Sequence, residues 1–147
     1  MQLEIVDYLR SHPAGVVATV GQDGTPQAAF VAIAATTDGE LVFDAKRGSR
    51  KIANLRFNSR IAIVVGGTDD TTLQCEGIAD IPDGAEREHA ARAYLAAFPQ
   101  FAASLRDSEI VVVRVRPTWV RFGDYRTDPP CIAEAVLSGP FDRQPGQ

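Results

Sequence analysis

Short strand-forming runs separated by tight turns are the feature that most constrains the fold of this chain. Six or seven such runs are predicted, at 16–20, 27–34, 41–43, 61–65, 72–81, 110–115 and 119–122. Turn-forming residues fill the connections, and Arg116-Pro117 is expected to separate the last two runs. Helical patterns stand at 2–11, 49–57 and 84–97, without the regular strand–helix alternation of a doubly wound sheet. The order predicts a mainly β fold, a small and mainly antiparallel barrel with flanking helices.

Length and composition suit one globular domain. The 147 residues can bury a core without disulfides, so Cys75 and Cys131 are expected to be free thiols. We expect residues 1–127 to form the domain and residues 128–147, rich in Pro and Gly, to form an irregular tail that is mobile in part. Residues 1–12 carry no apolar signal core, and the longest apolar runs are too short to span a membrane. We therefore expect a cytoplasmic protein with no membrane partner.

The hexapeptide KRGSRK at 46–51 concentrates positive charge in an acidic chain. It holds Lys46, Arg47, Arg50 and Lys51. Residues 45–68 include six basic side chains and no acidic one, while the other 123 residues include nine basic and 19 acidic ones. The net charge of −4 and the isoelectric point near 5.1 argue against a broad face for nucleic acid. The size of the basic segment suits a small anion.

The helix predicted after this segment indicates how its positive charge could bind an anion. Ser49 is a natural N-cap, so Arg50 and Lys51 fall in the first helical turn, where the free N–H groups already carry partial positive charge. A bound phosphate would make each of these groups favourable, and Gly48 would let it approach the backbone. The alternative interpretation is a solvated basic turn that balances a nearby acidic surface.

Three stretches of the chain carry a family likeness: GELVFDAKRGSRKIANLRFNSRIAIVV at 39–65, LQCEGIADI at 73–81 and GVVATVGQDGTPQAAFVAI at 15–33. They resemble the flavin-binding split barrel of the pyridoxamine 5′-phosphate oxidase-like superfamily, and the stretch at 15–33 resembles its first hairpin. The likeness runs from about residue 3 to residue 125. It implies a six-stranded antiparallel split barrel, a homodimer, and FMN held in two symmetric clefts at the dimer interface.

The resemblance also implies a set of cofactor-binding residues. Arg50 and Lys51 would hold the FMN phosphate, with Ser49 capping the helix beside it. Asp44 and Ala45 match positions that touch the cofactor, and Gln74 matches a glutamine that contacts the flavin. The strand at 29–34 would run alongside the isoalloxazine ring.

Departures from the family pattern concern the substrate. Where pyridoxamine 5′-phosphate oxidase has an arginine and a lysine on its second strand, this chain has Ala29 and Ala34. The tryptophan and Arg-Leu-His signature near its C-terminus is also missing. These differences argue against oxidation of vitamin B6 and leave the substrate site undefined.

Other candidate residues carry little chemical signal. His12 and His89 have no partner at metal-ligand spacing in the sequence, so both are expected to be solvated, and no metal site is predicted. Cys75 is expected to be a small buried hydrophobe. Three aromatic residues are expected to pack in the core or at a subunit contact: Trp119, Phe122 and Tyr125. At a subunit contact they could also line the flavin cleft.

The function predicted from these observations is that of an FMN-dependent oxidoreductase. The flavin would pass hydride between a reduced nicotinamide and a small organic substrate, so no catalytic side chain is identified. Three alternatives remain open. They are a reductase that uses a deazaflavin coenzyme, a non-catalytic flavin carrier or sensor, and a purely structural dimeric barrel.

Overall fold

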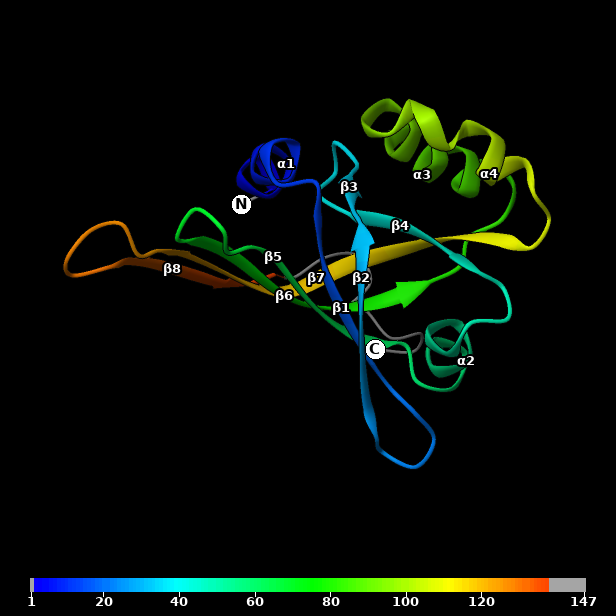
Figure 1. The fold of residues 1–147 in the computed structure, drawn as a ribbon, viewed down its shortest axis with the longest axis horizontal. Coiled ribbons are helices and arrows are strands. Elements are labelled where there is room, and N and C mark those ends of the chain that lie inside the picture. The colour runs from blue at the N-terminus through cyan, green and yellow to red at the C-terminus, as the bar shows by residue number, and fades with distance from the viewer. Residues whose placement is uncertain (1, 138–147) are drawn as a thin grey trace, which may run out of the picture.

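A computed structural model describes residues 2–137 of the chain (Figure 1). Strands make up most of it, and helices flank them. In chain order the elements are α1 (Gln2–Ser11), β1 (Ala14–Val20), β2 (Pro26–Ala32), β3 (Ala34–Ala35), β4 (Leu41–Lys46), α2 (Arg50–Phe57), β5 (Arg60–Gly66), β6 (Thr71–Asp80), α3 (Gly84–Ala97), the 3-10 turn η1 (Pro99–Phe101), α4 (Ala102–Arg106), β7 (Ile110–Asp124) and β8 (Cys131–Val136). None of the described helices is long and apolar enough to cross a membrane.

One antiparallel sheet forms the body of the molecule. Its strands follow the order β2-β1-β5-β6-β7-β4-β3, and β8 pairs with β7 outside this path. The sheet curls into a half-barrel with α1, α2, α3 and α4 at its sides (Figure 1). The prediction of a mainly β, antiparallel split barrel with flanking helices is confirmed. The described residues form eight strands rather than the six that were expected.

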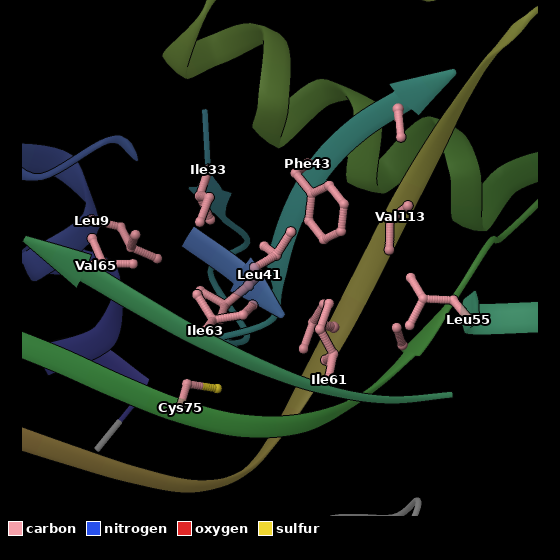
Figure 2. Close-up of a cluster of buried hydrophobic side chains, with 14 of the residues drawn as sticks. Leu9, Ile33, Leu41, Phe43, Leu55, Ile61, Ile63, Val65, Cys75 and Val113 are labelled. Carbon is pink, nitrogen blue, oxygen red and sulfur yellow. The ribbon is translucent and has the colours of Figure 1, made fainter. Parts of the chain in front are cut away.

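The main hydrophobic core fills the inside of the curled sheet (Figure 2). On β6, buried and exposed residues alternate, so Leu73 and Cys75 face inward while Gln74 faces outward. On β4, Leu41, Phe43 and Ala45 belong to this core. The inward side chains that Figure 2 labels include Ile33, Leu41, Phe43, Ile61, Ile63, Val65, Cys75 and Val113.

A second core lies between the sheet and helices α3 and α4. Val42 on β4 and Val112 on β7 pack there against Tyr94, Phe98 and Leu105. The opposite faces of β4 and of the start of β7 are buried in the main core, so these segments are covered on both sides. This explains why their sequences read as continuous apolar runs without polar alternation.

Strand β7 differs from its prediction because it passes through Pro117 without interruption. The expected break at Arg116-Pro117 is wrong: one strand runs over Ile110–Asp124. The register with β6 shifts at this point, with Glu76 opposite Trp119 and Gly77 opposite Pro117, so Thr118 is an extra residue. A bulge is one of the few places where a strand accepts proline, which has no N–H to donate to the ladder.

The segment after residue 127 is also more regular than expected. The prediction of an irregular tail from Asp128 is wrong for Cys131–Val136, which form β8 and pair with β7. Residues 138–147 lie outside the described part of the chain. The strand predicted at 27–34 is interrupted at Ile33, whose N–H donates to the carbonyl of Pro13 at 2.9 Å.

Candidate cofactor site

Ser49 occupies the N-cap position of α2, as predicted. Its carbonyl accepts a hydrogen bond from the Ala53 N–H at 3.1 Å, and its own N–H donates to the Lys46 carbonyl at 3.0 Å. The side chain, however, forms no capping hydrogen bond. The Ser49 hydroxyl is buried and has no hydrogen-bond partner among the described residues. A buried hydroxyl without a partner costs free energy, so a ligand atom that accepted its hydrogen would relieve that cost.

Arg50 and Lys51 form the first turn of α2, which contains no acidic residue. Within residues 2–137, neither side chain forms an ion pair or a side-chain hydrogen bond with another residue. The helix field at this end repels cations, and nothing in the described chain compensates for it. The two charges therefore lie where an anion would be favoured.

A cavity of about 340 Å³ lies between α2 and the β1–β2 hairpin. Arg50 and Lys51 line it from the helix, and the strands contribute Val17, Thr19, Gln27, Ala28 and Ala29. The fold thus places the basic helix start beside the second strand, which the sequence pattern alone did not show. Because Ala29 lies in this wall, β2 presents a methyl group where the oxidase named above has a charged side chain.

Asn54 holds α2 in this position. Its Nδ2 donates to Thr19 Oγ1 at 2.9 Å and to Gln27 Oε1 at 2.8 Å, so one buried amide ties the helix to both strands of the hairpin. Sequence reasoning missed this residue. The available signal was a polar side chain at a position that the helical period places on the buried side of α2.

These residues fit a phosphate group. The buried Ser49 hydroxyl and the N–H groups at the start of α2 lie at one helix terminus with Arg50 and Lys51, which pair with no other described residue. A Cβ atom added at Gly48 would meet nothing within 4 Å, so there is open space beside this backbone. Two cationic side chains and a free hydroxyl are donors that suit a dianion.

Asp44 and Ala45 lie at the end of β4, and their side chains do not line this cavity. The Asp44 carboxylate accepts a hydrogen bond from the Tyr94 hydroxyl at 3.1 Å, on the side of the sheet that faces α3. Burial, together with the Asp44 charge, raises the pKa of Tyr94 well above its ordinary value, so the phenol stays protonated and donates. Ala45 is buried in the main core. Contacts from either residue to a ligand at α2 would have to come from the backbone.

Gln74 lies on the outer face of the sheet. Its register row runs through Val64 on β5 and Val16 on β1 to Phe30 on β2. Val17, which lines the cavity, is next to Val16 in sequence and therefore points to the opposite face. Within one chain, Gln74 is not brought together with Arg50 and Lys51.

His12 is not the solvated residue that the sequence analysis expected. Its ring stacks on Tyr8 with centroids 3.9 Å apart, and its Nε2 lies 2.7 Å from Asp69 Oδ2. The hydrogen bond to Asp69 raises the pKa of His12 above its ordinary value. Hydrogen bonds from Thr71 and then His12 hold the pKa of Asp69 well below its usual range. This group links α1 to the loop between β5 and β6.

His89 also has neighbours that lie far from it in sequence. Its Nε2 is 3.6 Å from Asp38 Oδ2, and Glu40 offers an oxygen within 4.8 Å of both groups. Glu40 already accepts a hydrogen bond from Arg116 at 3.4 Å and lies 3.9 Å from the Arg114 guanidinium. The charge of Glu40 is therefore balanced by arginine.

The remaining candidates behave as structural residues. Cys75 is buried in the main core, as expected of a small hydrophobe, and burial raises its pKa to about 12. Cys131 is exposed, and both thiols are free, as predicted. Phe122 packs on the main core and meets the edge of Tyr8, while Tyr125 is half-exposed.

Comparison with solved structures identifies several proteins that share this fold. The heme binding protein from Mycobacterium smegmatis aligns with a TM-score of 0.78 and 22% identity, over 92% of this chain and 57% of that one. The heme storage protein from Vibrio cholerae gives 0.67 and 16%, over 78% and 88%. A pyridoxamine 5′-phosphate oxidase-related, FMN binding protein from Nostoc punctiforme gives 0.65 and 14%, over 93% and 94%. At these identities the likeness shows the fold alone.

Sequence comparison defines the family more directly. No curated protein matches the chain at a significant level. The family model for pyridoxamine 5′-phosphate oxidase matches residues 1–123, which include every strand from β1 to β6 and nearly all of β7. Because the match spans most of the sequence, this chain belongs to the pyridoxamine 5′-phosphate oxidase family.

Proposed function

We propose that this chain is a cytoplasmic FMN-dependent oxidoreductase in which Ser49, Arg50 and Lys51 hold the phosphate of the cofactor. The observation that supports this most is the buried Ser49 hydroxyl, next to Arg50 and Lys51 in the sequence; none of these three side chains has a partner among residues 2–137. The FMN binding protein of the same fold adds support at the level of the fold. A cytoplasmic location agrees with the free thiols of Cys75 and Cys131.

The electrostatic terms favour a ligand with a phosphate over one without it. Each cation at a helix N-terminus is unfavourable by about 0.3–1 kcal/mol when exposed, and a bound anion reverses that sign. A charge-assisted hydrogen bond contributes about 1.5–3 kcal/mol, so two of them change affinity by at least about a hundredfold. FMN should therefore bind far more tightly than riboflavin, which has the same ring and no phosphate.

The chemistry would belong to the flavin. Bound FMN supplies hydride transfer between a reduced nicotinamide and a small organic substrate. The described residues that line the cavity include no histidine and no carboxylate, and Thr19 and Gln27 are engaged by Asn54. The chain's own contribution is to grip the phosphate, to orient the ring along β2 and to shape the pocket.

A homodimer completes this proposal. The outer face of the sheet exposes large apolar side chains on several strands, which a second copy of the chain would cover. These residues, with their exposed fractions, are Phe30 (76%), Val64 (38%), Ile78 (42%) and Val136 (84%).

The same face carries polar groups that a partner would use. Gln74 is exposed there, and its register neighbour on β7 is Arg121, whose buried Nε has no hydrogen-bond partner among the described residues. In a dimer built through this face, Gln74 would contact a flavin at the interface, which is how it would join the site.

Equilibrium binding of FMN and riboflavin tests the proposal. We expect tight binding of FMN, seen as quenching of flavin fluorescence, and binding of riboflavin that is weaker by at least about a hundredfold. Equal affinities would show that the phosphate is not recognised. With FMN bound, oxidation of reduced nicotinamides should then be measured across a panel of small acceptors, and persistent inactivity would favour the carrier or sensor alternative.

Binding and absorbance measurements also distinguish FMN from two other cofactors. Preferential binding of a deazaflavin coenzyme would favour the deazaflavin-dependent reductase. Heme is a second candidate because proteins of this fold from Mycobacterium smegmatis and Vibrio cholerae are named for heme binding and storage. A Soret band in the copurified protein, without flavin absorbance, would favour heme over FMN.

A further inference from the structure

A second basic cavity, of about 480 Å³, lies between α2 and helices α3 and α4. Four arginines line it, each from a different part of the fold: Arg47 from the turn after β4, Arg56 from α2, Arg87 from α3 and Arg106 from the end of α4. In Figure 1, α2 lies on one side of β4 and β7, and helices α3 and α4 lie on the other. The cavity shares no lining residue with the one at Arg50 and Lys51.

Two of these guanidinium groups are held in place by backbone carbonyls. Arg47 donates from both Nε and Nη2 to the Ser108 carbonyl, at 3.3 and 3.0 Å. Arg87 donates from Nη2 to the Leu105 carbonyl at 3.1 Å. Each keeps further N–H groups, since a guanidinium has five donors. Groups held in this way lose less entropy when they bind a ligand.

The charge of the cavity is not neutralised by the described chain. None of the four arginines forms an ion pair with a residue of 2–137. Asp83 and Asp107 also line the cavity, and Asp107 accepts a hydrogen bond from the Glu109 N–H at 2.9 Å. Four positive and two negative side chains leave an excess of two positive charges. Buried apolar residues, among them Val111 and Val112, form part of the wall and strengthen electrostatic interactions by excluding water.

Helix stability explains only part of this arrangement. Arg56 and Arg106 stand in the last turns of α2 and α4, where a cation interacts favourably with the helix dipole. That effect does not apply to Arg47, which lies in a turn, or to Arg87, which lies in the first turn of α3. The helix dipole therefore does not explain why all four arginines line one concave surface.

We propose that this cavity binds a small molecule bearing two or more phosphate groups. Guanidinium groups recognise phosphate oxygens through paired N–H donors, and four of them match a di- or triphosphate better than a single phosphate. The concave shape favours a small ligand over a nucleic acid, which the net charge of −4 would also repel. The inference does not depend on the proposed flavin site.

Calorimetry with inorganic tripolyphosphate tests this site on the full-length chain. The key variant is Arg56→Gln with Arg106→Gln, because neither side chain forms a hydrogen bond or ion pair within residues 2–137, and the fold should persist. We expect one saturable site in the wild type and affinity reduced by at least about tenfold in this variant. Arg92→Gln, an exposed arginine of α3 outside this cavity, is the matched control and should bind as the wild type does.

Three outcomes would overturn the inference. One is the absence of saturable binding to the wild type. Another is that Arg50→Gln with Lys51→Gln abolishes tripolyphosphate binding while the Arg56/Arg106 variant binds as the wild type does. That result would place the anion at the start of α2. The third is tighter binding of a single-stranded oligonucleotide than of tripolyphosphate through Arg56 and Arg106, which would indicate a macromolecular partner. Thermal denaturation of each variant verifies that the protein is folded.

Discussion

Asn54 on α2 donates its side-chain amide to Gln27 on β2, with 2.8 Å between Nδ2 and Oε1. The same Nδ2 lies 2.9 Å from the buried Thr19 hydroxyl, so the helix that carries Arg50 and Lys51 is fixed to the hairpin that forms the other wall of the cavity. Removing this one amide should therefore affect both the stability of the fold and the position of the basic residues.

Replacement of Asn54 by Leu should lower the free energy of unfolding by about 1–3 kcal/mol, because two polar partners lose their hydrogen bond and one of them is buried. It should also weaken FMN binding, since α2 is no longer held against β2. Urea denaturation measures the first effect and fluorescence titration the second. Gln22→Ala, in the exposed turn between β1 and β2, is the control and should change neither quantity. Wild-type stability in the Asn54 variant would show that the tether does not hold the helix.

Replacement of Arg50 and Lys51 by Gln should separate binding from stability. FMN affinity should fall by at least about a hundredfold, because two charge-assisted interactions are lost. The cofactor-free protein should be equally stable or more stable by a few tenths of a kcal/mol, roughly the cost of cations in a first helical turn. Arg60→Gln, at the exposed start of β5, is the matched control. Unchanged FMN affinity would remove the assignment of the phosphate to α2.

Ser49→Ala should leave the stability of the cofactor-free protein nearly unchanged. An N-cap serine usually contributes about 0.5–2 kcal/mol, but the Ser49 hydroxyl makes no capping bond to lose. If that hydroxyl binds phosphate instead, FMN affinity should fall by about 10- to 150-fold, the equivalent of about 1.5–3 kcal/mol for a hydrogen bond to a charged group. Asp83→Ala, at the N-cap of α3, also removes a side chain without a capping bond and should not alter FMN binding. A large loss of stability in Ser49→Ala would show that the hydroxyl does cap the helix.

The His12–Asp69 pair should make stability depend on pH in a defined direction. The pKa of His12 is raised above its ordinary value near 6.5, chiefly by the hydrogen bond to Asp69. Its contribution is therefore complete below pH 6.5 and is lost as the pH rises through the folded pKa. The pKa of Asp69 is lowered from its ordinary value of 3.8, so its contribution is present above that pH and is lost on acidification. The pair should stabilise the fold most between about pH 4 and 6.5.

Proton NMR titration of the His12 ring measures this effect. In Asp69→Asn the midpoint should move down toward the ordinary value, and the advantage of the wild type in thermal denaturation should shrink between pH 6 and 9. Asp38→Asn removes the carboxylate near His89 and should leave the His12 titration unchanged. A wild-type midpoint at or below 6.5 would contradict the pairing.

Phe30→Glu should dissociate the proposed homodimer, because it places a charge where β2 exposes a large apolar side chain. Analytical ultracentrifugation should show a monomer of the variant at concentrations where the wild type is a dimer. Phe57→Glu, on α2 and away from the outer sheet face, is the control and should remain dimeric. A wild-type protein that is monomeric at every concentration would rule out this part of the proposal.

The elements themselves were readable from short-range patterns. The exposed–buried alternation of β6, the apolar stripe of α2 and the turn residues between strands each depend on neighbours within a few positions, and they determined the mainly β class. The misplaced cations at the start of α2 were visible for the same reason. Local sequence could even place Ser49 at the N-cap, although it could not show that the hydroxyl would remain unpaired.

Long-range pairing decided the rest. Pro117 continues a strand because β6 offers a bulge opposite it, and Cys131–Val136 form β8 because the edge of β7 is there to pair with. His12 gains Asp69 across 57 positions, and Arg47, Arg56, Arg87 and Arg106 meet around one cavity from four separate segments. Such contacts depend on which surfaces the curled sheet brings together. A charged side chain or a strand edge meets its partner only when the chain has folded, so a local sequence pattern does not identify that partner.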